Sequence, residues 1–311
     1  MGTDGNHAGP GTGGRDVAGS LAVFDEHRGL LFSIAYRMLG SVADAEDVLQ
    51  EAFLRWRRAG DSAEEVRSPR AYLSSVVTRL CIDHLRSARV RRERYVGPWL
   101  PEPLPTGSDA SERVALEESL SVAFLVLLES LSPTERAVFL LRDVFDYEYG
   151  EVSRLVGKSE ANCRQIARRA RQAVAARRPR FDSSPEQERR LTDRFLAVCA
   201  DGDMEGLLEM LSEDVVLLSD GGGKTRAALN PIRGADNVAR YFFGILRKAP
   251  PGLTVRATPV NGRPGFVAYF GDGSPQSATT FEISGGRILA IHLVVNPDKL
   301  GAITPLRNGE R

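Results

Sequence analysis

The sequence predicts a multidomain protein in which two all-α helical domains precede an α+β domain with an antiparallel sheet. Its 311 residues exceed what a single core usually supports. Apolar residues recur at helical spacing up to about residue 181, and after residue 185 the pattern changes to glycine turns and β-branched runs. Two breaks, the proline-rich stretch 95–109 and the polar stretch 182–187, separate these segments.

The composition is that of an ordinary soluble chain, with 42% hydrophobic and 26% charged residues and a formal net charge of zero. No run approaches the roughly 18 to 20 apolar residues that span a bilayer. The glycine-rich start lacks the basic and then apolar order of a signal peptide. We therefore expect a disordered leader over residues 1–18 and a cytoplasmic protein with no membrane partner.

The three cysteines, Cys81, Cys163 and Cys199, lie far apart and form no CxxC pair. We expect them to pack as reduced thiols on helix faces. We predict no metal site and no cofactor.

The first helical domain, residues 19–95, opens with two helices. Apolar residues from Leu31 to Leu39 fall at helical spacing, and Gly40 is a natural stop. Ser41 and Asp44 then resemble a capping box for a second helix. One face of that helix is an apolar stripe that must meet a core, and the opposite side is an acidic patch with an apolar centre: Asp47, Gln50, Glu51 and Leu54. This patch is either a solvated surface or a docking site for a basic partner.

Ser68 and Pro69 start a third helix that continues into the basic run "RVRRER". Its apolar positions face inward. Another side carries charged residues, namely Arg79, Asp83, Arg86, Arg89, Arg91 and Arg92. This mainly basic side suits the phosphate backbone of a nucleic acid.

The second helical domain, residues 111–181, has the sequence pattern of a helix-turn-helix. A short helix near 150–156 ends at Gly157, and Ser159 caps the next helix. The stretch from Arg154 to Arg180 contains nine Lys or Arg residues and one acidic residue. The outward side of the second helix carries Glu160, Asn162, Arg164, Gln165, Arg168 and Arg171. Such a helix is suited to the major groove of DNA, and a solvated basic helix is the alternative.

The linker, residues 96–110, and a later glycine loop are candidate contacts between domains. Four prolines favour an extended linker, which is either a plain spacer or, through Trp99 beside Pro98, an anchor on another surface. The loop Gly221–Gly223 with Lys224 resembles a phosphate-binding loop, but the position five residues before Gly223 is Leu218, so the spacing fails. The loop is either a flexible turn or a place of close backbone approach, from which Lys224 projects as a charged latch toward an acidic partner in the first helical domain or in the linker.

The last domain, residues 185–311, starts with two amphipathic helices and continues with strands near 253–260, 265–270, 278–284 and 288–295. Asp220, Tyr241, Tyr269 and His292 are conceivable acids or bases, but no spacing forces them to meet. We therefore predict no catalytic residue, and we interpret His292 as a hydrogen-bonded strand residue. The aromatic residues of this part belong to a core or line a small-molecule pocket.

Two long stretches resemble extracytoplasmic-function (ECF) sigma factors. "DAEDVLQEAFLRW" (44–56) with "SPRAYLSSVVTRLCIDHLRSAR" (68–89) is similar to their region 2, and the stretch 131–171 is similar to their region 4. The words "YVGPWLPEPL", "DGGGK" and "NPDKL" resemble the subgroup with a SnoaL-like C-terminal extension, a cone-shaped α+β domain with a curved antiparallel sheet. Relatives often have Asn where this chain has Arg79.

The resemblance implies specific partners. The Asp47 patch matches the helix that docks on the β′ clamp helices of core RNA polymerase, and region 4 meets the β flap. Residues 67–94 match the part that binds and melts the single-stranded −10 element, and Glu160 to Arg171 match the reader of the duplex −35 element. The resemblance leaves open whether an anti-sigma partner exists.

The subgroup resemblance also implies a regulatory role in cis for the C-terminal domain. The expected interdomain residues are Trp99, Pro101, Gly221, Gly222, Gly223, Lys224, Asn296, Pro297 and Asp298. The alternative is a DNA-binding head fused to a small-molecule sensor or to an enzyme of the ketosteroid-isomerase type. A polar, accessible cavity in the cone would favour that alternative, and a cone filled by aromatic side chains would oppose it.

Overall fold

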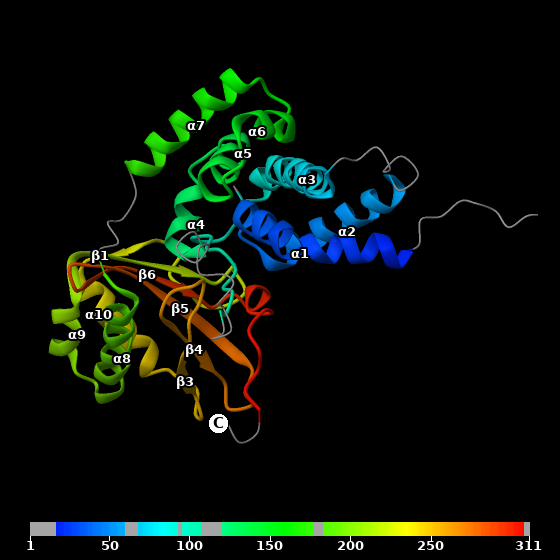
Figure 1. The fold of residues 1–311 in the computed structure, drawn as a ribbon. Helices are drawn as coiled ribbons and strands as arrows, with labels where there is room; N and C mark the ends of the chain where they lie inside the picture. The colour runs from blue at the N-terminus through cyan, green and yellow to red at the C-terminus, as the bar shows by residue number, and fades with distance from the viewer. Residues whose placement is uncertain (1–16, 60–67, 93–94, 107–119, 177–182, 308–311) are drawn as a thin grey trace, which may run out of the picture.

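The computed structural model describes residues 17–59, 68–92, 95–106, 120–176 and 183–307 (Figure 1). The predicted leader therefore lies almost wholly outside the described residues. The helical part comprises α1 (Val17–Leu39), α2 (Val42–Arg58), α3 (Pro69–Arg92), α4 (Val122–Leu128), α5 (Pro133–Phe139), a π-helical turn η6 (Leu140–Val144), α6 (Tyr149–Val156) and α7 (Glu160–Ala175). No helix among these described residues, or among those of the C-terminal domain, is long and apolar enough to cross a membrane.

Local capping signals set the helix boundaries. Gly40 takes a left-handed φ of 68° after α1, and the Ser41 hydroxyl accepts a hydrogen bond from the Asp44 amide at the start of α2. Ser132 and Glu135 form a complete capping box before α5. Gly157 ends α6 in the left-handed conformation. These elements match the sequence expectations closely because each signal lies within four residues of the boundary that it sets.

The two helical domains share one apolar core. Buried residues from α1 and α3, such as Leu31 and Leu73, belong to the same cluster as Leu140 and Val152 of η6 and α6. A buried arginine joins them further: Arg136 of α5 donates to the Met38 carbonyl at 2.7 Å and to the Leu128 carbonyl at 2.7 Å. The two helical domains therefore pack directly against each other in this structure.

The C-terminal domain is an α+β fold with a six-stranded sheet. Its elements are α8 (Pro185–Asp201), α9 (Met204–Met210), β1 (Leu211–Asp220), β2 (Ile232–Arg233), α10 (Ala235–Leu246), β3 (Thr254–Ala257), β4 (Gly265–Tyr269), β5 (Pro275–Ser284), β6 (Arg287–Val294) and η7 (Pro297–Lys299). The strand order is β2-β1-β6-β5-β4-β3. All neighbours are antiparallel except β1 and β6, which pair in parallel.

The expected α+β class with a mainly antiparallel sheet is confirmed, and the parallel β1–β6 pair is the difference. Strands that pair in parallel need a long crossover, and here the crossover contains β2, α10 and three further strands. Alternation in hydrophobicity cannot reveal that distant pairing.

The two faces of the sheet have different neighbours. Helices α8, α9 and α10 cover one face, where Phe195, Phe242 and Phe281 belong to a buried cluster (Figure 1). The other face packs against the linker through Leu100 and against α4 through Val126. The second face therefore turns toward the helical domains.

Candidate functional site

The predicted polymerase-docking patch lies exposed on α2. Asp47, Gln50 and Leu54 are exposed, and Leu54 leaves 42% of its surface accessible. Glu51 is half-buried and pairs with Arg55 at 2.7 Å. The opposite stripe, from Ala45 to Trp56, is buried, so the two-faced pattern of the sequence is present in the fold.

The predicted DNA-reading face lies exposed on α7. The helix buries Cys163, Ile166 and Ala170 against the core. All six predicted residues lie on the exposed side: Glu160, Asn162, Arg164, Gln165, Arg168 and Arg171. Arg164 pairs with Glu160 at 3.0 Å, one helical turn away. This face is accessible from solvent in the described structure.

The predicted −10 face on α3 is engaged by the other helical domain. Arg79 donates to the carbonyls of Leu155 at 3.4 Å and Arg154 at 3.2 Å, which lie at the C-terminal end of α6. That end of a helix carries unsatisfied carbonyls and a partial negative charge, which a guanidinium stabilises. Further along α3, Asp83 and Arg86 are exposed and lie 3.5 Å apart.

Nearby contacts extend this interface between α3 and region 4. The Ser74 hydroxyl lies 2.8 Å from the Tyr147 hydroxyl, and the Arg70 guanidinium lies 5.3 Å from the Tyr147 ring centre. The side chains of Arg89, Arg91 and Arg92 lie outside the described residues. The structure thus bonds the start of the predicted −10 face to α6, while Arg79 itself stays exposed to solvent.

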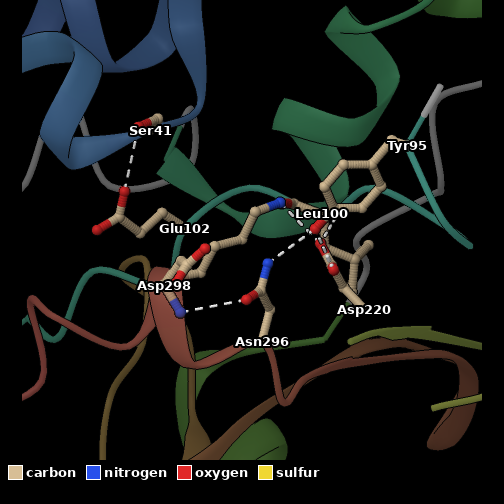
Figure 2. A network of polar contacts seen from close by, with 8 residues as sticks. Ser41, Tyr95, Leu100, Glu102, Asp220, Asn296 and Asp298 are labelled. Atoms are coloured by element: carbon tan, nitrogen blue, oxygen red, sulfur yellow. Dashed lines mark hydrogen bonds and ion pairs between the residues drawn. The ribbon is translucent and has the colours of Figure 1, made fainter. Parts of the chain in front are cut away.

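The linker is docked on the C-terminal domain around the buried carboxylate of Asp220 (Figure 2). Tyr95 donates its hydroxyl hydrogen to this carboxylate at 2.5 Å, and the Leu100 amide donates at 2.8 Å. Lys299 donates to it at 2.7 Å and also to the Leu100 carbonyl at 2.5 Å. The buried carboxylate is therefore paired with a cation and with hydrogen-bond donors, as a buried charge requires.

Aromatic rings of the linker surround the Lys299 ammonium. Its nitrogen lies 4.2 Å from the Trp99 ring centre and 5.0 Å from that of Tyr95, both distances at which a cation attracts a π system. Burial raises the pKa of Tyr95, and the bond to Asp220 raises it further. The Tyr95 hydroxyl therefore stays protonated and acts as the donor to Asp220.

The other side of the linker is fixed to region 2 through Glu102. Its buried carboxylate accepts from the Val42 amide at 2.7 Å and from the Ser41 hydroxyl at 3.2 Å, at the N-terminus of α2 (Figure 2). A carboxylate at that end of a helix satisfies free amides and complements the dipole. Burial raises the pKa of Glu102, and these donors oppose that rise. The linker thus supplies a cap to the helix that carries the polymerase-docking patch.

Asn261 fixes the last part of the linker to both domains. Its side chain accepts from the Leu104 amide at 3.0 Å and donates to the Tyr36 hydroxyl at 2.6 Å. Tyr36 in turn donates to the Glu102 carbonyl at 2.6 Å. Region 2, the linker and the C-terminal domain therefore meet in one hydrogen-bonded cluster, which we call the linker dock: Tyr36, Tyr95, Trp99, Leu100, Glu102, Asp220, Asn261, Asn296 and Lys299.

The glycine loop fits closely under the linker. A Cβ on Gly222 would overlap the Asn296 amide and come within 3.0 Å of the Tyr95 hydroxyl, and one on Gly223 would meet Val96 at 3.2 Å. A Cβ on Gly221 would meet the Thr225 carbonyl at 2.5 Å. Gly222 and Gly223 also have positive φ. The loop is therefore a close-approach turn, one of the two interpretations of the sequence.

The remaining predicted interdomain residues lie around the same cluster. Asn296 donates to the Tyr95 hydroxyl at 2.9 Å, and Pro297 begins η7. Trp99 and Pro101 approach Gly40. Lys224 pairs with Asp298 at 2.5 Å, and both side chains are more than half exposed. Lys224 therefore joins two segments of the C-terminal domain and does not reach region 2 or the linker as a charged latch.

Sequence reasoning missed several members of the linker dock, namely Tyr36, Tyr95, Glu102, Asn261 and Lys299. The motifs that contain Tyr95, Glu102 and Lys299 were singled out, but their pairings are not local. Asp220 was considered only as an acid or base inside the cone. Tyr36 and Asn261, 225 positions apart, offer no pattern in the sequence.

The inside of the cone is filled by aromatic rings. Phe195 of α8 lies at its centre, with ring centres 5.2 Å from Phe242, 5.9 Å from Phe266 and 4.9 Å from Phe281. The four proposed acids and bases do not gather there. Tyr241 contacts Ser219 on the helix-covered face, whereas Tyr269 belongs to the linker-facing cluster and Asp220 bonds the linker.

His292 also lies away from the cone, beside Leu218 and Thr280 in the sheet. Its Nε2 lies 3.4 Å from a Glu282 oxygen, and its Nδ1 has no hydrogen-bond partner among the described residues. We expected His292 to be a hydrogen-bonded strand residue, and among the described residues only its Nε2 has a polar neighbour. Burial lowers the pKa of His292 to about 4 and raises that of Glu282 to about 7.

Replacing His292 with leucine is expected to change the pH dependence of stability. The folded state resists protonation of His292, so the contribution of this residue is present above pH 6.5 and is lost as the pH falls toward 4. Glu282 acts in the opposite direction, but both chains contain it. Relative to wild type, His292→Leu should gain stability as the pH falls from 6.5 to 4. Urea unfolding measures this difference, and a difference independent of pH would contradict the assignment.

Comparisons with known proteins identify both helical domains. Residues 23–91 match sigma-70 region 2, and residues 121–174 match sigma-70 region 4. The chain is 40% identical over 294 residues to the ECF RNA polymerase sigma factor SigJ of Mycobacterium tuberculosis, covering 90% of this chain and 92% of that protein. It is 36% identical over 293 residues to the probable ECF RNA polymerase sigma factor SigI of the same organism, covering 92% and 95%.

The likeness extends to the whole fold. The crystal structure of SigJ from Mycobacterium tuberculosis matches with a TM-score of 0.75 at 36% identity, covering 92% of this chain and 100% of that one. Because the similarity includes both sigma regions and the C-terminal domain, the chain belongs to the ECF RNA polymerase sigma factors, which bind core RNA polymerase and direct it to promoters.

Proposed function

We propose that each helical surface has a separate role in initiation and that the C-terminal domain regulates them in cis. The α2 patch binds the β′ clamp helices, α7 reads the −35 element, and α3 binds and melts the −10 element, while region 4 also meets the β flap. The linker dock holds the connection between the two DNA-binding domains. The observation that supports the regulatory role is the attachment of one linker to both region 2 and the C-terminal domain.

DNA geometry requires the two helical domains to separate. The −10 and −35 elements are about 25 base pairs apart, which is about 85 Å along B-DNA. In this structure Arg79 on the −10 face bonds α6 of the helix-turn-helix directly. The closed arrangement is therefore incompatible with simultaneous binding of both elements, and promoter binding needs an open form.

The docked linker limits how far the domains can separate. Residues 93–119 would reach about 90 Å if fully extended. Tyr95 to Thr106 are instead bonded to Asp220, Asn261 and neighbouring groups of the C-terminal domain. Release of this stretch restores the reach of the linker. The C-terminal domain thus regulates how readily the chain opens on a promoter.

In the closed form, the two predicted DNA-binding faces have different contacts. Both faces are exposed to solvent, but Arg79 donates to carbonyls of α6 in the other helical domain, whereas Arg164 and Arg171 of α7 contact groups of their own domain. This asymmetry supports an order in which duplex −35 DNA binds before the −10 strand does. It also supports opening as the regulated step.

The filled cone supports a scaffold role for the C-terminal domain in preference to catalysis or small-molecule sensing. Phe195 packs against Phe242 and Phe281 inside the cone, which leaves this part of the interior to aromatic rings. Asp220, the one carboxylate among the four candidate acids and bases, is fully buried and bonded to the linker. We propose that this domain has no enzymatic activity.

Combining Asp47→Lys with Leu54→Gln is expected to weaken binding to core polymerase at least tenfold. The change cancels the net negative charge of the patch and removes its exposed apolar centre, and interface energy concentrates in few such residues. Titration of labelled chain with core polymerase measures the dissociation constant. Glu186→Lys is the matched control, because it makes the same change in charge at an exposed position of α8. Equal affinity of wild type and double variant would refute the assignment of this surface.

A further inference from the structure

The arginines of the DNA-reading helix are held by groups outside that helix. Arg164 of α7 places its guanidinium carbon 5.0 Å from the ring centre of Tyr149, the first residue of α6. Arg171, two turns further along α7, donates to the Tyr149 hydroxyl at 3.4 Å. One tyrosine therefore contacts two of the predicted reading residues at once.

An aspartate of the preceding π-helical turn supports the same arrangement. Arg171 donates through Nε to Asp143 at 2.9 Å, and its Nη2 lies 2.8 Å from the same oxygen. Arg142, the neighbour of Asp143, lies 5.3 Å from the Tyr149 ring centre and pairs with Asp146 at 2.9 Å. The turn η6 thus brings both Asp143 and Arg142 to the side of α7 that carries the arginines.

We infer that Tyr149 and Asp143 are positioning residues for −35 recognition, orienting Arg164 and Arg171 before DNA arrives. This inference rests on the proposed role of α7 as the −35 reader. Neither residue is a predicted DNA contact. They act through the arginines, whose long side chains otherwise lose rotamer freedom on binding.

The energetic basis is preorganisation. An arginine that is free to rotate loses side-chain entropy when it meets a base edge or phosphate, and prior ordering of one such side chain is worth about two- to tenfold in affinity. A planar guanidinium also stacks on an aromatic ring without losing its hydrogen-bond donors in the ring plane. Arg164 can therefore keep its contact with Tyr149 while it reads DNA.

The role of Asp143 makes an unusual prediction. A carboxylate near DNA repels phosphates, so its neutralisation alone should strengthen binding to every DNA sequence. If Asp143 orients Arg171, Asp143→Asn should instead lower the preference for the −35 sequence over unrelated duplex, even where binding to unrelated duplex becomes tighter. The ratio of the two affinities separates orientation from simple charge.

The experiment uses the full-length chain and DNA duplexes selected by wild type from a library randomised at the −35 position. Fluorescence anisotropy gives the affinity for the selected duplex and for a scrambled duplex, and thermal unfolding confirms that each variant folds. Tyr149→Leu is expected to lower the affinity ratio about two- to tenfold. Tyr149→Phe keeps the ring on Arg164 and should retain most of the ratio. In the Arg164→Ala background, Tyr149→Leu should have a smaller effect than in wild type.

The outcomes separate this inference from the function on which it rests. If Arg164→Ala lowers the affinity ratio and Tyr149→Leu and Asp143→Asn leave it unchanged, the positioning role is wrong and α7 remains the reader. If Arg164→Ala and Arg171→Ala also leave the ratio unchanged, α7 is not the reader, and both the reading role of α7 and the positioning role of Tyr149 and Asp143 are wrong. Equal losses in Tyr149→Phe and Tyr149→Leu would overturn the stacking contact.

Discussion

Replacing both Arg164 and Arg168 with alanine is expected to abolish promoter-specific initiation. Both side chains lie exposed on α7, on the side opposite the core residues Cys163 and Ala170. Loss of one good base or phosphate contact costs about 1–3 kcal/mol, so losing two should weaken −35 binding about thirtyfold or more. Run-off transcription with core polymerase on a selected promoter measures the effect.

The matched control for this variant is Arg189→Ala with Arg190→Ala. These arginines are exposed on α8 of the C-terminal domain, so the same charge is removed away from the reading face. The control should initiate at the wild-type level. Full activity of the Arg164 and Arg168 variant would refute the assignment of α7.

Replacing Asp220 with alanine is expected to release the linker and open the chain. The carboxylate is fully buried and accepts from Tyr95, Leu100 and Lys299, so its loss leaves a poorly exposed ammonium without its counter-ion. Removing one partner of a buried pair costs about 3–5 kcal/mol. We expect the released chain to bind single-stranded −10 DNA more tightly, because the Arg79 guanidinium no longer bonds the carbonyls of α6. Binding of duplex −35 DNA should change little.

Lys224→Ala is the control for the Asp220 variant. It breaks the ion pair between Lys224 and Asp298. Both side chains are more than half exposed, and such surface pairs contribute about 0–1 kcal/mol to stability. The variant should leave −10 binding close to wild type. Asp220→Ala with an unchanged affinity for the −10 strand would show that the linker dock does not control access to α3.

The sequence predicted the elements that local signals determine. The caps at Ser41, Ser132 and Gly157 and the two faces of α2 and α7 depend on residues within one or two turns, so their patterns are visible in the chain itself. The predicted residues of α2 and α7 are therefore exposed in the fold, except Glu51, which is half-buried. Their roles in binding polymerase and DNA stay predictions.

The linker dock could not be predicted to the same depth because its contacts are distant in sequence. Trp99, Gly222 and Asn296 were recognised through their motifs, but nothing local pairs Glu102 with the start of α2 or Asn261 with Tyr36. The shared core of the two helical domains and the parallel β1–β6 pair also join residues that are far apart in sequence, so they could not be predicted either. The role of Asp220 changed most, from a possible acid inside the cone to the centre of the linker dock.

The distance between α3 and α7 tests the central claim most directly. Fluorophores at Ser87→Cys and Ala175→Cys, both exposed positions, in a Cys199→Ser background report this distance in the free chain and in a complex with core polymerase and a selected promoter. The account predicts that this distance rises by several tens of ångströms from the free chain to the promoter complex, toward the roughly 85 Å spacing of the two promoter elements, and that it rises partly in Asp220→Ala alone. An unchanged distance in the promoter complex would contradict the closed and open forms on which the account depends.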